Sequence, residues 1–117
     1  MTIAESVISE IMRQMPQGAD KYLVPTGGDG FKLCIHWKLN SDPERPNKYS
    51  KTIAIQVPRE LIEDFPGYPE NMQKHALAKI GTYIQDKLKA FDPNHDSPRG
   101  VPEPVEHWAL LVENIFG

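Results

Sequence analysis

Residues 31–39, with the sequence FKLCIHWKL, carry the most regular pattern in the chain. Apolar side chains occupy every second position: Phe31, Leu33, Ile35, Trp37 and Leu39. The positions between them hold Lys32, Cys34, His36 and Lys38. Successive side chains of a β-strand point to opposite faces of its sheet. The pattern therefore predicts a strand with one apolar face and one polar face.

Two further segments around this strand are typical of β-structure. Residues 22–24 are β-prone and end at Pro25, and a glycine-rich turn at residues 26–30 joins them to the central strand. Residues 51–57 resume the alternation after a loop at residues 40–48. Because consecutive strands are usually neighbours, we expect a three-stranded antiparallel meander.

Helical patterns lie on both sides of these strands. Residues 2–15 begin with a capping box formed by Thr2 and Glu5 and continue with apolar residues at helical spacing. Pro58 suits the first turn of a short helix that reaches Phe65. Residues 70–91 predict a long amphipathic helix. We expect the first and the long helix to pack on the Phe31 and Trp37 face of the sheet.

The C-terminal segment, residues 105–116, is compatible with two structures. Its apolar residues match helical spacing, which we favour, but residues 108–112 would also serve as a buried strand. A proline-rich stretch at residues 92–104 precedes it and predicts a surface loop. The segment is too apolar for a free tail, so we expect it to cover the helical layer or the neighbouring chain of a dimer.

Taken together, these elements predict one α+β domain spanning residues 1–117. The net charge is −3, and Cys34 is the only cysteine, which excludes an intrachain disulfide and any multi-cysteine zinc site. The N-terminal residues lack a secretory signal, and no apolar run approaches the ~20 residues that span a bilayer. We therefore expect a soluble cytoplasmic protein that does not enter membranes.

The polar face of the central strand is the surface for which the sequence offers no cover. We take it, with the adjoining loop, as the candidate interaction face, which comprises Lys32, Cys34, His36, Lys38, Arg45, Lys48 and Lys51. No motif specifies a reaction, and no cofactor is indicated. The expected function is therefore that of a non-enzymatic protein–protein interaction module that binds through this face or the C-terminal segment, with self-association as one form of the interaction.

An alternative function is nucleic-acid binding through the same basic residues. The order helix–strand–strand–strand–helix resembles, in outline, that of the double-stranded-RNA-binding fold. That family has a lysine-rich signature at the start of its second helix, which residues 71–75 (NMQKH) do not match. A net charge of −3 also disfavours an affinity based on neutralising phosphates.

Two patterns include residues with relevant chemistry without completing a site. Cys34 and His36 lie two residues apart on one strand, about 7 Å along it, which is too far for an efficient nucleophile–base pair. In residues 92–103, oxygen-bearing side chains follow the spacing of a calcium loop: Asp92, Asn94, Asp96 and Glu103. Ser97 replaces the glycine required at the sharp turn of such a loop, so a solvated surface loop is the preferred interpretation.

Overall fold

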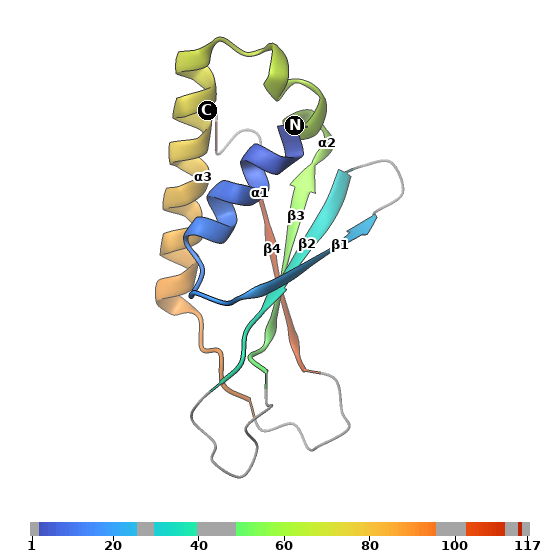
Figure 1. The fold of residues 1–117 in the computed structure, drawn as a ribbon, viewed down its shortest axis with the longest axis vertical. Coiled ribbons are helices and arrows are strands. Elements are labelled where there is room, and N and C mark those ends of the chain that lie inside the picture. Colours follow the sequence, from blue (N-terminus) through green and yellow to red (C-terminus); the bar gives the residue numbers. More distant parts are fainter. Residues whose placement is uncertain (1–2, 26–29, 40–48, 96–102, 112–114, 116–117) are drawn as a thin grey trace.

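The computed structural model describes residues 3–25, 30–39, 49–95, 103–111 and 115. Within them the chain forms three α-helices, a short 3-10 helix and four strands (Figure 1). In chain order these are α1 (Ile3–Arg13), β1 (Asp20–Pro25), β2 (Gly30–His36), β3 (Thr52–Pro58), α2 (Arg59–Glu63), η1 (Phe65–Gly67), α3 (Glu70–Ala90) and β4 (Val105–Ala109).

The four strands form a single sheet in the order β1-β2-β3-β4. The first two pairings are antiparallel, as in the expected meander, with Leu23 opposite Leu33 and Leu33 opposite Ile55. The third pairing is parallel and places Trp108 beside Ile55. A parallel neighbour needs a crossover connection, which α2, η1 and α3 supply.

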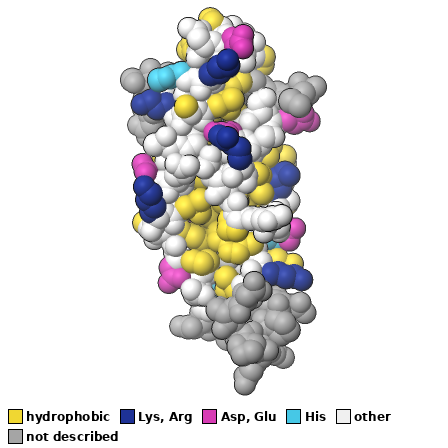
Figure 2. Space-filling model, turned by 60° about the vertical axis from the view of Figure 1, so that its left-hand side comes forward, with side chains coloured by type: hydrophobic (Ala, Val, Ile, Leu, Met, Phe, Trp, Pro, Cys, Tyr) yellow, Lys and Arg dark blue, Asp and Glu magenta, His cyan; other side chains and the backbone are white. Residues whose placement is uncertain are grey.

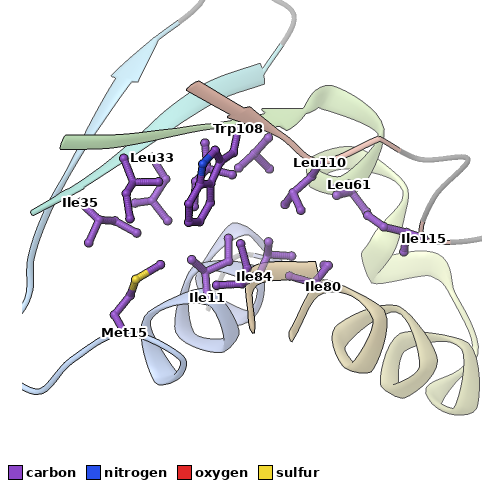
Figure 3. Packing of buried hydrophobic residues seen from close by; sticks show 14 of the residues in the cluster. Ile11, Met15, Leu33, Ile35, Leu61, Ile80, Ile84, Trp108, Leu110 and Ile115 are labelled. Atoms are coloured by element: carbon purple, nitrogen blue, oxygen red, sulfur yellow. The ribbon is translucent and has the colours of Figure 1, made fainter. Parts of the chain in front are cut away.

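The helices cover one face of the sheet, as the sequence predicts. Helices α1 and α3 lie on the same side of the strands in Figure 1. Figure 3 shows the resulting core, in which Leu33, Ile35 and Trp108 point from the sheet toward Ile11 and Ile84 of the helices. The expected placement of Phe31 and Trp37 against this core is confirmed. The helical layer is therefore set by the apolar faces of the strands and of both long helices.

The C-terminal segment corrects the expectation of a three-stranded sheet. Its spacing favours a helix, but Val105–Ala109 is a fourth strand. The alternation is obscured in the sequence because Glu106 shares the inward parity of Trp108. The structure compensates this polar side chain, since the Glu106 carboxylate accepts a 2.6 Å hydrogen bond from Trp108 Nε1.

Three apolar residues of the C-terminal segment are buried within the chain, whereas Val105 and Leu111 remain 50% and 45% exposed. Trp108, Leu110 and Ile115 are buried in the same core as the helices, and Leu110 and Ile115 approach Leu61 in Figure 3. The segment therefore packs on the helical layer, the first of the two expected arrangements. None of the helices in the described ranges is long and apolar enough to cross a membrane.

Gly81 lies where α3 approaches α1 rather than where it approaches the sheet. A glycine in the interior of a helix often marks a close approach by a neighbouring element. A Cβ built at Gly81 would lie 2.8 Å from Glu10 Oε1 and 3.3 Å from Gln14 Nε2. A 2.8 Å hydrogen bond from Gln85 Nε2 to Gln14 Oε1 joins the same two helices. The small residue thus accommodates polar side chains at a helix–helix contact.

Candidate functional site

The face of the sheet that the helices leave uncovered is called here the outer face. The strand register places Lys32, Cys34 and His36 on it, as the alternation predicts. Lys38 lies beyond the end of β2, in an isolated bridge with Tyr49. Lys51 directly precedes β3; its charge helps to lower the pKa of Asp92, and its N–H donates a 3.0 Å hydrogen bond to the Pro93 carbonyl oxygen. Arg45 and Lys48 lie outside the described residues.

Cys34 is buried although it belongs to the outer face. Only 6% of its surface is exposed, between Tyr22 of β1 and Ala54 of β3, which are its partners in the register. Tyr22 lies directly opposite Cys34 in the β1–β2 register. Partial burial of the phenol raises the pKa of Tyr22, and the charges of Cys34 and Glu103 raise this pKa further. Tyr22 therefore lies beside the thiol on the outer face.

His36 lies between two tyrosine rings. It stacks on Tyr49 with ring centroids 4.3 Å apart and meets Tyr22 edge-on at 6.4 Å. His95 Nε2 lies 2.9 Å from the Tyr49 carbonyl oxygen and anchors that residue from the other side. The buried His36 Nδ1 has no hydrogen-bond partner within the part of the chain that the structure describes. The imidazole is consequently a packed ring in an aromatic cluster.

This packing does not favour covalent chemistry at Cys34. A nucleophilic thiol needs access to its substrate and a base within hydrogen-bond reach. Cys34 is only 6% exposed beside its cross-strand partner Tyr22, and the ring of His36 stacks on Tyr49. Cys34 and His36, which the sequence places on one face, are therefore packed side chains of the sheet.

The residues whose spacing resembles a calcium loop have separate local interactions. Asp92 accepts hydrogen bonds from the Asn94 N–H at 3.0 Å and from Asn94 Nδ2 at 3.1 Å, and these bonds lower the pKa of Asp92. Glu103 acts instead on Tyr22 of β1, and Asp96 lies outside the described residues. Among the residues with described positions, no three His, Cys, Asp or Glu side chains gather as a metal site would require.

The β1 edge, Asp20–Pro25, is the most exposed strand of the sheet. All six of its residues are exposed, and Tyr22, Leu23 and Val24 retain 50%, 52% and 39% of their surface. Leu23 points to the same side as the helices, so its exposure shows that the helical layer stops short of β1. Apolar side chains thus protrude on both sides of an edge strand. Other hydrophobic side chains gather in Figure 2 toward the end of the molecule where α3 finishes.

The opposite edge of the sheet, strand β4, is hydrogen-bonded to a helix. In β4, the Ala109 N–H donates a 3.3 Å hydrogen bond to the Tyr83 hydroxyl of α3. In the described ranges, β1 has a strand neighbour on one side only, namely β2. An edge strand presents unpaired backbone groups that can accept another strand. Within the described residues, β4 is therefore joined to a helix at Ala109, and β1 is an exposed apolar edge.

Sequence reasoning finds the central strand of this surface but overlooks its edge. Residues 22–24 are identified as a strand, yet their exposure depends on how far the helices extend, which periodicity does not report. A signal is nevertheless present: Tyr22, Leu23 and Val24 are three consecutive apolar residues in a strand whose neighbours, Asp20 and Lys21, are charged. Such a run cannot place all its apolar side chains on one face.

Comparison of the chain with protein-family models, with curated proteins and with solved structures gives no match.

Proposed function

We propose that the chain is a non-enzymatic protein–protein interaction module that binds its partner along the β1 edge. The observation that carries this proposal is the run Tyr22–Val24, whose three apolar side chains are exposed on the two sides of an edge strand. Protein surfaces rarely leave apolar residues together on an open edge without an occupant, because such edges promote association.

The expected mode of binding is strand addition. An extended segment of the partner pairs with the free backbone groups of β1, and its alternate side chains contact the two faces. Tyr22 and Val24 offer contacts on the outer face, and Leu23 offers one on the opposite side. The main-chain bonds supply affinity, whereas these three side chains select the partner's sequence.

The described arrangement gives less support to nucleic-acid binding. Lys32 is the one lysine or arginine that the register places on the outer face of the four strands. Lys38 and Lys51 lie outside the four strands, and the charge of Lys51 helps to lower the pKa of Asp92. Affinity for nucleic acid needs several cations aligned along the phosphates, so the protein interaction is the function we retain.

The proposal is tested by placing charge on the edge. Full-length protein carrying Leu23→Lys and Val24→Lys is used as bait in the native cell, with crosslinking before lysis, beside the wild type. Met72→Lys is the matched control, because Met72 is also an exposed apolar residue, 36% exposed, but lies on α3. We expect a protein recovered by the wild type and the control to be lost with the double variant.

Binding must also map to the edge. With the recovered protein purified, hydrogen exchange of the backbone amides of Asp20–Pro25 should slow on binding, while those of α3 should stay unchanged. Equal recovery by the double variant and the wild type, no specific recovery by the wild type, or protection confined to another surface would each overturn the proposal.

A further inference from the structure

The β1 edge is self-complementary when two copies meet antiparallel. A two-fold axis through one residue pairs that residue with itself, and residues equally far from it on either side become opposite. An axis through Asp20 or Lys21 opposes like charges. An axis through Tyr22 places Lys21 opposite Leu23, and an axis through Val24 leaves Tyr22 without an opposite residue in the strand.

An axis through Pro25 leaves Tyr22, Leu23 and Val24 all without an opposite residue in the strand, so an axis through Leu23 gives the remaining arrangement. Leu23 then faces Leu23 of the other copy, and Tyr22 faces Val24 on the outer side of the sheet. Aromatic and β-branched residues form favourable cross-strand pairs. Lys21 faces Pro25, so no charged residue of the strand meets a like charge. This register alone joins every exposed apolar side chain of the edge to another.

We propose that the strand accepted at this edge is β1 of a second copy, paired antiparallel about a two-fold axis at Leu23. The inference rests on the proposed function and names its partner. The uncovered inner side of Leu23, 52% exposed, leaves room for the approaching strand beside the helical layer. The joined sheets continue across the axis with Tyr22 of each copy beside Val24 of the other.

The size of this contact sets its strength. A strand of six residues is about 20 Å long. We expect two such strands to bury less surface area between them than the roughly 1,200 Å² at which stable, specific interfaces begin. The self-pairing therefore belongs to the weak class, in which monomer and dimer exchange and the dimer grows with concentration.

The self-facing position makes a charge-swap test decisive. Sedimentation velocity of the wild type from about 10 µM to 1 mM should show a monomer–dimer equilibrium. Leu23→Lys should weaken it about tenfold or more, because two ammonium groups then meet at the axis. Leu23→Glu should do the same alone, and an equimolar mixture of the two variants should associate again. Met72→Lys should behave as the wild type.

A second measurement does not depend on charge. In a Cys34→Ser background, Leu23→Cys should form a disulfide-linked dimer under diamide, since opposed Cα atoms of an antiparallel pair are about 4.5–5.5 Å apart, within disulfide reach. Met72→Cys in the same background should stay monomeric. Circular dichroism of each variant establishes that it is folded.

Failure of this inference is distinguishable from failure of the proposed function. A wild type that is monomeric up to 1 mM, or a lysine–glutamate mixture that does not associate, overturns the self-pairing. The interaction module survives that result if capture of a different protein still depends on Leu23 and Val24. Dimers that persist unchanged in both charge variants overturn the assignment to β1.

Discussion

The hydroxyl of Tyr83 accepts a 3.3 Å hydrogen bond from the Ala109 N–H, which ties helix α3 to the free side of β4. The ammonium of Lys87 lies over the same tyrosine ring, 5.7 Å from its centre. One side chain thus contacts the end of an edge strand, since β4 is the last strand in the sheet order.

Tyr83→Phe keeps the ring and removes the acceptor. We expect the free energy of unfolding to fall by about 0.5–1 kcal/mol, the usual net worth of one hydrogen bond. Urea titration measures this loss, and hydrogen exchange should show the Ala109 amide exchanging faster. Lys87→Ala serves as control, since it removes the cation and leaves the hydrogen bond. Unchanged exchange at Ala109 would contradict the assigned contact.

Gly30→Ala should be strongly destabilising. Gly30 has a φ of +113°, and a Cβ there would collide with the carbonyl oxygen of Val57. Backbone strain of this kind costs about 1–3 kcal/mol before the clash is counted, so we expect at least about 2 kcal/mol by urea titration.

Gly81→Ala provides the matched comparison within the same chain. Alanine gains about 1 kcal/mol over glycine in a helix interior. Its Cβ meets the end of the flexible Glu10 side chain, which is already held by Arg13 at 2.7 Å. These effects oppose each other, and we expect a net change within about 1 kcal/mol. Equal losses in the two alanine variants would refute the distinction drawn between the glycines.

His36→Phe should preserve the aromatic cluster while removing the unpartnered nitrogen. Leaving a buried polar atom unsatisfied costs about 1–3 kcal/mol, so its removal should keep or raise stability by up to about 1 kcal/mol. His36→Ala should instead lower the melting temperature, because it abolishes the stacking on Tyr49. Thermal unfolding of the two variants decides the point: a phenylalanine variant as unstable as the alanine variant would mean that the imidazole nitrogen has a partner.

Asp92 predicts a dependence of stability on acid pH. Its pKa is lowered by hydrogen bonds from the Asn94 N–H and side chain and by the charge of Lys51. The stabilisation is present above the unfolded pKa, about 3.9, and is lost as the pH falls through the lower folded value. NMR titration should place the Asp92 carboxyl midpoint below that of a model peptide. Asp92→Asn should flatten the acid limb of a urea midpoint profile, and an unchanged limb would contradict the prediction.

Local periodicity is sufficient to predict most of the fold. The alternation in residues 31–39 and 51–57 and the helical spacing before and after them identify β2, β3, α1 and α3, and the predicted antiparallel pairings are confirmed. The sequence leaves the C-terminal segment open between helix and strand and does not predict that it joins the sheet, because a parallel strand is defined by a distant neighbour. The sequence of residues 105–109 carries no signal that the second edge of β3 is available for pairing with them.

The candidate site is predictable in its centre and not at its rim. Alternation alone places Lys32, Cys34 and His36 on one face. It does not reveal that Tyr22 lies opposite Cys34 or that Tyr49 stacks on His36, because these contacts join segments through the tertiary fold. Exposure of the β1 edge likewise depends on where the helical layer ends.

The parallel pairing of β4 with β3 also orders the events of synthesis. A growing chain has completed β1, β2 and β3 well before Val105 leaves the ribosome, so the side of β3 reserved for β4 stays open throughout the translation of α2 and α3. During that interval β3 has an unpaired edge lined by apolar residues. Surfaces of this kind are bound by chaperones and are prone to aggregate. Arrival of Trp108 beside Ile55 ends this period of exposure.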